Sequence, residues 1–120
     1  MTQKIIVIKG DGIGPEIMDA TLAVLNALKL DFEYEFKEAG LAALESQGDL
    51  LPQNTLDAIS ATGVCLKGPL TTPVGKGFSS INVAMRRYFK LFANVRPVIT
   101  FPGTMARYEN IDILTVRENT

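Results

Sequence analysis

The apolar and polar positions of the chain follow two periods, one typical of strands and one typical of helices. Residues 4–9 form a β-branched run that ends at Gly10, a composition typical of a buried parallel strand. Residues 31–37 alternate aromatic with acidic positions, which predicts a strand with one solvated face at or near a sheet edge. Further strands are predicted at residues 63–67, 92–100 and 111–116.

Helical spacing fills most of the segments between these strands. After the turn at residues 10–14, Pro15 stands at a plausible first helical position. Shorter helices are expected at residues 41–46 and 52–60. The residues that repeat at helical spacing after this turn, and so predict the first helix, are Ile17, Thr21, Val24, Leu25 and Leu28.

A loop rich in proline and glycine, residues 68–77, follows the third strand. Ser79 or Ser80 is then expected to cap a helix that runs to about residue 90. Strands that alternate with helices imply an α/β fold with a parallel or mixed sheet and right-handed crossovers. Ligands of such sheets gather beyond the carboxyl ends of the strands, so the loops after Lys9, Lys67 and Val116 are candidate sites.

Composition limits the chemistry that the chain can perform. A chain of 120 residues with 47% hydrophobic content can bury one modest core, as a single globular unit or as a piece of a larger one. Because histidine is absent, a Ser-His-Asp triad, a Cys-His pair and a His-ligated zinc are excluded within this chain. Cys65 is the only cysteine, so no internal disulfide can form, which suits a reducing compartment.

The start of the chain runs directly into a strand-like segment, and the apolar stretches are far shorter than the roughly 20 residues that span a bilayer. No signal peptide or membrane anchor is therefore expected. The expected location is the cytoplasm, or an organelle matrix if the source is eukaryotic.

Positive charge is concentrated in one half of the chain, although the net charge is only −1. No acidic residue occurs from Ala58 to Tyr108, and all five arginines lie between Arg86 and Arg117. Such a block should favour an anionic partner. Arg87, Lys90 and Arg107 are interpreted as solvated surface charges.

The turn at residues 10–15 is superficially similar to a dinucleotide-binding loop. Its glycines are spaced G-x-G-x-G, and Pro15 stands where the third glycine of that fingerprint should be. A Rossmann loop is therefore not favoured. The structural alternative is a tight turn that leads into the start of a helix.

Ser80, Asn82 and Arg86 form a stronger candidate. On a helix that starts near Ser80, Asn82 and Arg86 are four residues apart and share a face. A hydroxyl, an amide and a guanidinium would then line one groove, next to backbone N–H groups that attract anions. Taken singly, Ser80 could be an ordinary cap and Asn82 an exposed helical residue.

Arg96 and Arg117 each emerge from an apolar predicted strand, and charges in such places usually have a partner. One explanation is a structural ion pair with Asp112 or Glu118. The other is a shared anionic ligand.

Five motifs, in order, resemble the landmarks of the isocitrate and isopropylmalate dehydrogenase family, and they cover essentially the entire chain. The motifs are GDGIGPEI at residues 10–17, KGPLTTPVG at 67–75, SINVAMR at 80–86, NVRP at 94–97 and VRENT at 116–120. The resemblance identifies the chain as the N-terminal part, residues 1–120, of a domain of this fold that is truncated on its C-terminal side.

By this resemblance, the carboxylates of the substrate are held by Ser80, Asn82, Arg86, Arg96 and Arg117. Thr71, in a loop between substrate and nicotinamide, is the expected cofactor-binding residue. The serine-x-asparagine spacing before Arg86 is similar to that of isocitrate dehydrogenases, whereas isopropylmalate enzymes place apolar residues there. Isocitrate is thus the favoured substrate, and no nucleic acid or membrane partner is expected.

The resemblance implies an oxidoreductase of the tricarboxylic acid cycle that converts isocitrate to 2-oxoglutarate. The hydroxyl is oxidised by hydride transfer to NAD, with NADP possible, and carbon dioxide is then lost. Mg²⁺ or Mn²⁺ would act as Lewis acid and template. The full-length enzyme is expected to be a homodimer or a higher oligomer.

The chain ends before the family's catalytic lysine, metal-binding aspartates and adenine-binding loop. Residues 1–120 are therefore expected to contain no catalytic residue and no metal site. Little cofactor affinity, no turnover and poor independent stability are expected of the chain alone.

Three alternatives remain open. The substrate could be homoisocitrate, 3-isopropylmalate or tartrate, or the chain could belong to a noncatalytic subunit that binds isocitrate as an effector. The third alternative is a generic phosphate-binding module at the helix start near Ser80. The resemblance also implies that Ser80 could be phosphorylated, as in some bacterial members, against the alternative of an unmodified cap.

Overall fold

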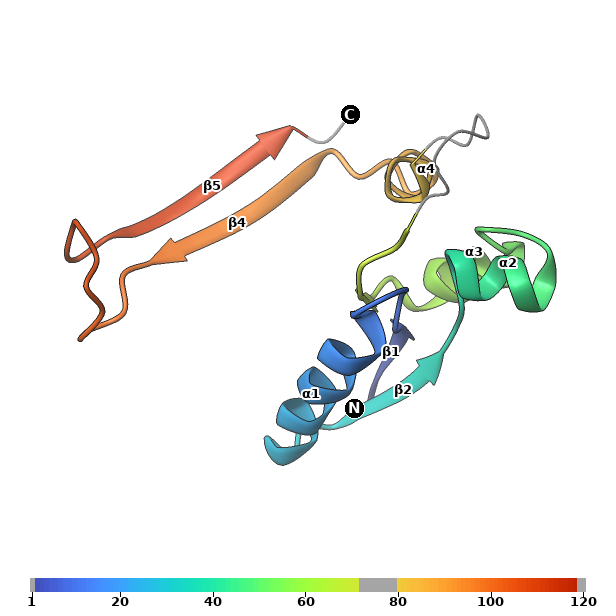
Figure 1. Ribbon diagram of the computed structural model, residues 1–120, viewed down its shortest axis with the longest axis horizontal. Coiled ribbons are helices and arrows are strands. Elements are labelled where there is room, and N and C mark those ends of the chain that lie inside the picture. Colours follow the sequence, from blue (N-terminus) through green and yellow to red (C-terminus); the bar gives the residue numbers. More distant parts are fainter. Residues whose placement is uncertain (1, 72–79, 119–120) are drawn as a thin grey trace. The chain divides into compact units, whose positions relative to one another are not determined.

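The computed structural model describes residues 2–71 and 80–118, and the chain divides into two compact units, Met1–Met85 and Arg86–Thr120. Its α/β organisation agrees with the fold predicted from the sequence (Figure 1). In chain order, the elements are β1 (Gln3–Ile8), α1 (Gly14–Ala27), β2 (Phe32–Phe36), α2 (Leu41–Gln47), α3 (Gln53–Thr62), β3 (Cys65–Lys67), α4 (Ile81–Tyr88), β4 (Ala93–Ile99) and β5 (Asp112–Glu118). Among the described residues, no helix has the length and apolar character needed to cross a membrane.

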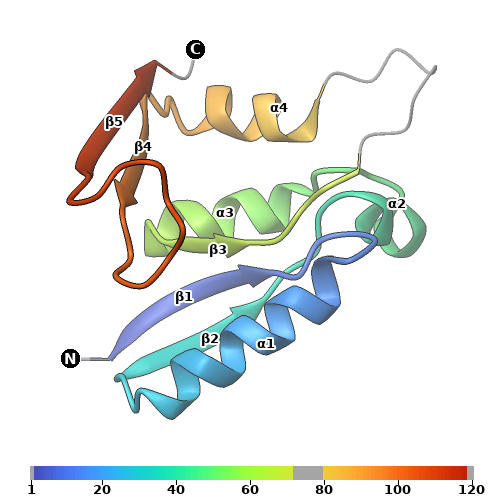
Figure 2. The same cartoon turned by 60° about the vertical axis from the view of Figure 1, so that its left-hand side comes forward.

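The first unit is built on a three-stranded parallel sheet in the order β2-β1-β3. β1 is central, and β2 lies at an edge, as its alternating sequence predicted. Helix α1 covers one face of this sheet, and α2 and α3 lie on the other (Figures 1 and 2).

The core of the first unit follows from the two faces of β1. Ile5 and Val7 pack with Met18 and Leu22 of α1, and Phe32 is among the aromatic residues that join this cluster. Because side chains alternate along a strand, Ile6 and Ile8 point to the opposite face, which α3 covers. Both isoleucines are fully buried, and each such burial contributes about 1.5–3 kcal/mol.

The buried residues of α1 differ from those whose spacing predicted the helix. Met18 and Leu22 face the core, whereas Ile17, Val24 and Leu28 are 45%, 62% and 60% exposed. The helix was predicted correctly, but the residues that follow the helical spacing are mostly not the ones that form the core. This helix carries two apolar stripes, and helical periodicity alone does not choose between them.

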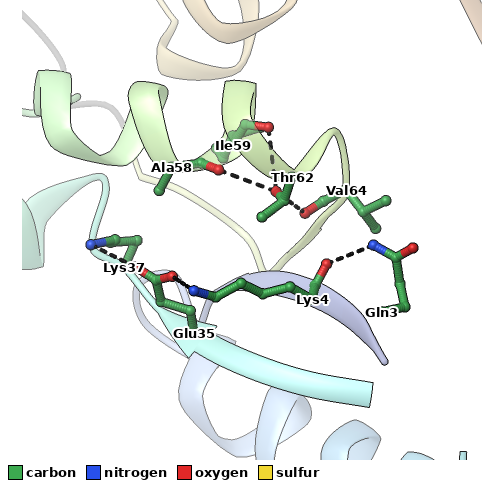
Figure 3. A network of polar contacts seen from close by, with 8 residues as sticks. All are labelled: Gln3, Lys4, Glu35, Lys37, Ala58, Ile59, Thr62 and Val64. Carbon is green, nitrogen blue, oxygen red and sulfur yellow. Dashed lines mark hydrogen bonds and ion pairs between the residues drawn. The ribbon is translucent and has the colours of Figure 1, made fainter. Parts of the chain in front are cut away.

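Polar contacts pin the edge of the sheet and the end of α3, as Figure 3 shows. The carboxylate of Glu35 on β2 lies between two ammonium groups, 2.7 Å from Lys4 Nζ and 2.9 Å from Lys37 Nζ. At the end of α3, the single O–H of Thr62 lies within hydrogen-bonding distance of the carbonyls of Ala58, Ile59 and Val64, at 3.2–3.3 Å, and can donate to one of them at a time. These contacts tie the partly exposed strand β2 and the α3–β3 connection to the sheet.

The second unit contains a two-stranded antiparallel ribbon, β4 paired with β5. Both strands were predicted, but the last strand does not end at Val116 as expected. Val116 lies inside β5, opposite Val95. The pairing is antiparallel because residues 100–111 return the chain directly, and a short return between neighbouring strands gives this direction.

Candidate functional site

The glycine turn after β1 packs tightly against the segment that follows β3. The N–H of Gly68 donates to the carbonyl of Ile8, and the N–H of Asp11 donates to the carbonyl of Pro69, both at 2.8 Å. A β-carbon on Gly10 would lie 2.1 Å from the Pro69 carbonyl oxygen, so only glycine fits there. This geometry matches the structural alternative raised above, a tight turn that leads into a helix.

Asp11 is buried at the centre of this junction, and its carboxylate accepts hydrogen bonds only from backbone N–H groups in the described part of the chain. The donors are Leu41 at 3.1 Å, Ala42 at 3.3 Å and Thr71 at 2.8 Å. The carboxylate therefore joins three segments that are 30 to 60 residues apart in sequence. Sequence reasoning treated Asp11 only as part of the turn. The available signal was an acidic residue between two glycines directly after a buried strand.

Thr71, the predicted cofactor-binding residue, is exposed and lies where this junction ends. Its backbone N–H donates to the Asp11 carboxylate at 2.8 Å. Thr72 to Ser79 lie outside the described residues.

Ser80, Asn82 and Arg86 are placed by helix α4. Ser80 is exposed directly before the helix, and its carbonyl accepts the N–H of Ala84 at 2.9 Å. Ile81 and Met85 form the buried face, 3% and 8% exposed. Asn82 and Arg86 are half-buried and lie four residues apart, so they share the adjacent face as predicted from the spacing.

Arg96 and Arg117 are brought together by the register of the ribbon. Arg117 stands opposite Asn94, and Arg96 lies two residues beyond Asn94 on the same strand. Because side chains two apart share a face, Asn94, Arg96 and Arg117 all project from one side of the ribbon. Diagonal neighbours of this kind are about 7–8 Å apart, close enough for two guanidinium groups to bind one ligand.

The same register removes the structural ion pair that the sequence left open. Asp112 stands opposite Ile99, and Glu118 stands opposite Ala93, so both acids belong to the other face of the ribbon. In the described part of the chain, neither Arg96 nor Arg117 forms an ion pair with them. Arg96 instead donates from Nε to the side-chain oxygen of Asn94 at 3.2 Å, a neutral partner.

The predicted carboxylate-binding residues thus form two groups in the structure. One is the Ser80, Asn82 and Arg86 face of α4, and the other is the Arg96 and Arg117 face of the ribbon. The convergence of the two groups on one hollow stays a prediction.

A cavity of about 590 Å³ opens beyond the carboxyl ends of β1 and β2, where an α/β sheet would be expected to bind ligands. None of the predicted site residues lines it. Its two lysines are already neutralised, Lys9 by Asp19 at 2.7 Å and Lys37 by Glu35 at 2.9 Å. The described lining of this cavity therefore offers no spare positive charge for a multiply charged carboxylate.

The described residues offer neither a metal site nor an activated thiol. Across residues 2–71 and 80–118, no three Asp, Glu or Cys side chains are grouped so that they could hold a metal ion. Burial raises the pKa of the Cys65 thiol to about 11, so this thiol stays protonated at neutral pH. No reaction step is therefore assigned to a bound metal ion or to the Cys65 thiol within the described residues.

Many sequence relatives align with most of this chain, among them two dehydrogenases. One, 49% identical over 118 residues, is an NADP-dependent isocitrate dehydrogenase from Thermus thermophilus, and the alignment covers 96% of this chain and 24% of the relative. The other, 44% identical over 119 residues, is a 3-isopropylmalate dehydrogenase from Methanothermobacter thermautotrophicus, with 99% and 35% covered.

A solved structure gives the same result at the level of the fold. The crystal structure of isocitrate dehydrogenase from Methylococcus capsulatus matches with a TM-score of 0.89 and 49% identity, covering 100% of this chain and 35% of that one. The chain therefore spans about a quarter to a third of the length of these proteins. Residues 4–120 also match the family described as isocitrate/isopropylmalate dehydrogenase. Since this match covers nearly every residue and the fold agrees, the chain belongs to the isocitrate/isopropylmalate dehydrogenase family.

Proposed function

We propose that this chain supplies the carboxylate-binding part of a decarboxylating dehydrogenase that acts on isocitrate with NAD or NADP. The observation that carries the proposal is the ribbon register, which gathers Arg96 and Arg117 on one face and leaves both ribbon-strand acids on the other. The serine-x-asparagine spacing at Ser80 and Asn82 favours isocitrate over the other substrates of the family.

The physical basis is the charge of the substrate. Three carboxylates in one pocket repel one another unless several fixed cations offset them. Arginine suits this task because its guanidinium is permanently charged and can grip a carboxylate with two parallel hydrogen bonds. Arg86 on α4 would add a third such group to the pair on the ribbon.

Thr71 would bind the cofactor near its nicotinamide. The bound nicotinamide would accept a hydride from the carbon that carries the substrate's hydroxyl group. The residues of this chain hold and orient the carboxylates, and Mg²⁺ or Mn²⁺ would be bound by residues outside it. The chain alone should therefore give no NADH or NADPH when mixed with isocitrate, Mg²⁺ and cofactor.

The proposal is tested in a completed enzyme, defined as the Methylococcus capsulatus isocitrate dehydrogenase in which residues 1–120 replace the matching segment. Replacing Arg86 by alanine should raise the apparent KM for isocitrate at least tenfold. Loss of one partner of a buried charge pair costs on the order of 2–5 kcal/mol, which is consistent with that change.

Arg87 provides the matched control, because it is the next residue on α4 and is exposed. Arg87→Ala should leave the KM for isocitrate within twofold of the unsubstituted completed enzyme. An unchanged KM in Arg86→Ala, or equal increases in both variants, would contradict the assignment.

The second candidate substrate is 3-isopropylmalate, since a relative with 44% identity is named 3-isopropylmalate dehydrogenase. Rates with isocitrate, homoisocitrate, 3-isopropylmalate and tartrate, measured side by side in the completed enzyme, decide between them. Isocitrate should have the highest kcat/KM.

Location and assembly belong to the same proposal. The enzyme would act in the cytoplasm or an organelle matrix, as a homodimer or a higher oligomer.

A further inference from the structure

Asp11 is a buried carboxylate, and its hydrogen-bond partners among the described residues are backbone N–H groups. Burying an ionised carboxylate is costly unless hydrogen bonds compensate it. In this chain, the N–H groups of Leu41, Ala42 and Thr71 provide that compensation. Gly40 shows how tightly the group is held, because a β-carbon there would lie 2.2 Å from a carboxylate oxygen of Asp11.

The hydrogen bonds that the Asp11 carboxylate accepts differ in length. The bond to Thr71 is 2.8 Å long, whereas those to Leu41 and Ala42 are 3.1–3.3 Å. Hydrogen bonds to a charged acceptor are short when their geometry is good, so the contact with Thr71 is the best formed.

The segment before Thr71 is fixed independently of Asp11's side chain. Main-chain bonds join Gly68 to Ile8 and Pro69 to Asp11, both at 2.8 Å. A β-carbon on Gly68 would lie 2.1 Å from the carbonyl oxygen of Lys9, which shows that the backbone at Gly68 packs closely against the backbone at Lys9. The carboxylate of Asp11 is the contact that extends this order to Thr71.

We propose that Asp11 is a positioning residue for cofactor binding. Its carboxylate sets the backbone of Thr71 so that the exposed threonine side chain is presented to the nicotinamide nucleotide. The inference rests on the proposed function, because it takes Thr71 as the cofactor contact. Asp11 itself would touch neither cofactor nor substrate.

The first test is amide hydrogen exchange within residues 1–120 of the completed enzyme, with Asp11→Asn as the variant. Asparagine keeps the shape and one acceptor oxygen but turns an N–H₂ donor toward the backbone N–H groups. Exchange at the Thr71 amide should accelerate at least tenfold, while the β1 amides of Ile6 and Val7 keep their protection. Unchanged exchange at Thr71 would overturn the inference. Loss of protection throughout the chain would also overturn it, because Asp11 would then support the fold as a whole.

The second test is binding to the completed enzyme. Because NADH and NADPH fluoresce, their Kd can be measured without substrate, and the Kd for isocitrate can be measured separately. Asp11→Asn should raise the Kd of the preferred nucleotide at least fivefold and leave the Kd for isocitrate within twofold. A nucleotide Kd that does not change, or equal increases for both ligands, would refute the positioning role.

Asp49→Asn is the matched control, since the carboxylate of Asp49 also accepts a backbone N–H, from Leu51 at 3.0 Å, but at an exposed turn. This variant should change neither Kd. If the unsubstituted completed enzyme binds nucleotide but not isocitrate, the proposed substrate is wrong. The comparison of nucleotide Kd values still decides the role of Asp11.

Discussion

Replacing Gly10 by alanine should destabilise the chain more than the same replacement at Gly63, although both glycines have a positive φ, +83° and +71°. A β-carbon on Gly63 meets no atom within 4 Å, whereas one on Gly10 would lie 2.1 Å from the carbonyl oxygen of Pro69. That oxygen accepts the N–H of Asp11 at 2.8 Å, so it cannot retreat without breaking the bond. Both substitutions place alanine at a positive φ, but only the one at Gly10 also brings the new β-carbon into collision with a carbonyl oxygen.

The magnitude follows from these two parts. A positive φ costs alanine about 1–2 kcal/mol, and the lower entropy of the unfolded chain returns about 0.4–1 kcal/mol. Gly63→Ala should therefore lose about 1 kcal/mol. Gly10→Ala must also open a 2.1 Å contact to at least the 3.4 Å of ordinary packing. Overpacking costs typically about 1–3 kcal/mol and the broken hydrogen bond about 0.5–1.5 kcal/mol, so the extra loss is about 2–4 kcal/mol.

Urea unfolding followed by circular dichroism measures these losses as changes in midpoint at constant m-value. Gly68→Ala adds a check on the collision alone, because Gly68 has no positive φ but its β-carbon would lie 2.1 Å from the Lys9 carbonyl oxygen. Gly10→Ala should lose the most, Gly68→Ala less and Gly63→Ala the least. If Gly10→Ala were no more destabilised than Gly63→Ala, the close packing of the turn would not contribute to stability.

Two further predictions concern charge. Hydrogen bonds from Lys4 and Lys37 lower the pKa of Glu35 from 4.5 to about 2, so its ionised form stabilises the fold above pH 4.5 and that contribution is lost as the pH falls to 2. Glu35→Gln should lower Tm at pH 7, and the decrease of Tm between pH 4.5 and 2 should be smaller in this variant than in the unsubstituted protein. Salt at 1 M should weaken the effect. The control variant Glu33→Gln should not reproduce it. Ser80→Asp should abolish isocitrate binding to the completed enzyme, measured by calorimetry, because its charge repels the carboxylates, while retained binding would contradict the placement of Ser80 in the pocket.

The parallel sheet was predictable from the sequence because its signals are local. The β-branched run of residues 4–9 became the buried central strand β1, and the alternating residues 31–37 became the edge strand β2. Burial on two faces or on one is encoded directly in such patterns. The short helices α2 and α3 were also predicted, although α3 continues to Thr62 and ends at Gly63, which the prediction had assigned to the next strand.

Long-range choices were not available from the same patterns. The face of α1 that enters the core depends on which of two apolar stripes meets the sheet. The direction in which β5 pairs depends on the path of the preceding connection. The role of Asp11 depends on a contact with Thr71, 60 residues away, which no local pattern records. The two arginines of the ribbon were identified by type, but their common face required the register.

The described ion pairs are formed by lysines and not by arginines. Lys4, Lys9 and Lys37 neutralise carboxylates within the fold, and none of the five arginines forms an ion pair with a described carboxylate. Arg96 contacts a neutral amide, and Arg107 stacks 5.4 Å from the ring of Tyr108. Since no described carboxylate pairs with these guanidinium groups, the polycarboxylate of the proposed function would displace none of the described ion pairs. Its attraction would be opposed by desolvation and screening. The affinity of such a site should therefore depend on ionic strength far more than the stability of the sheet does.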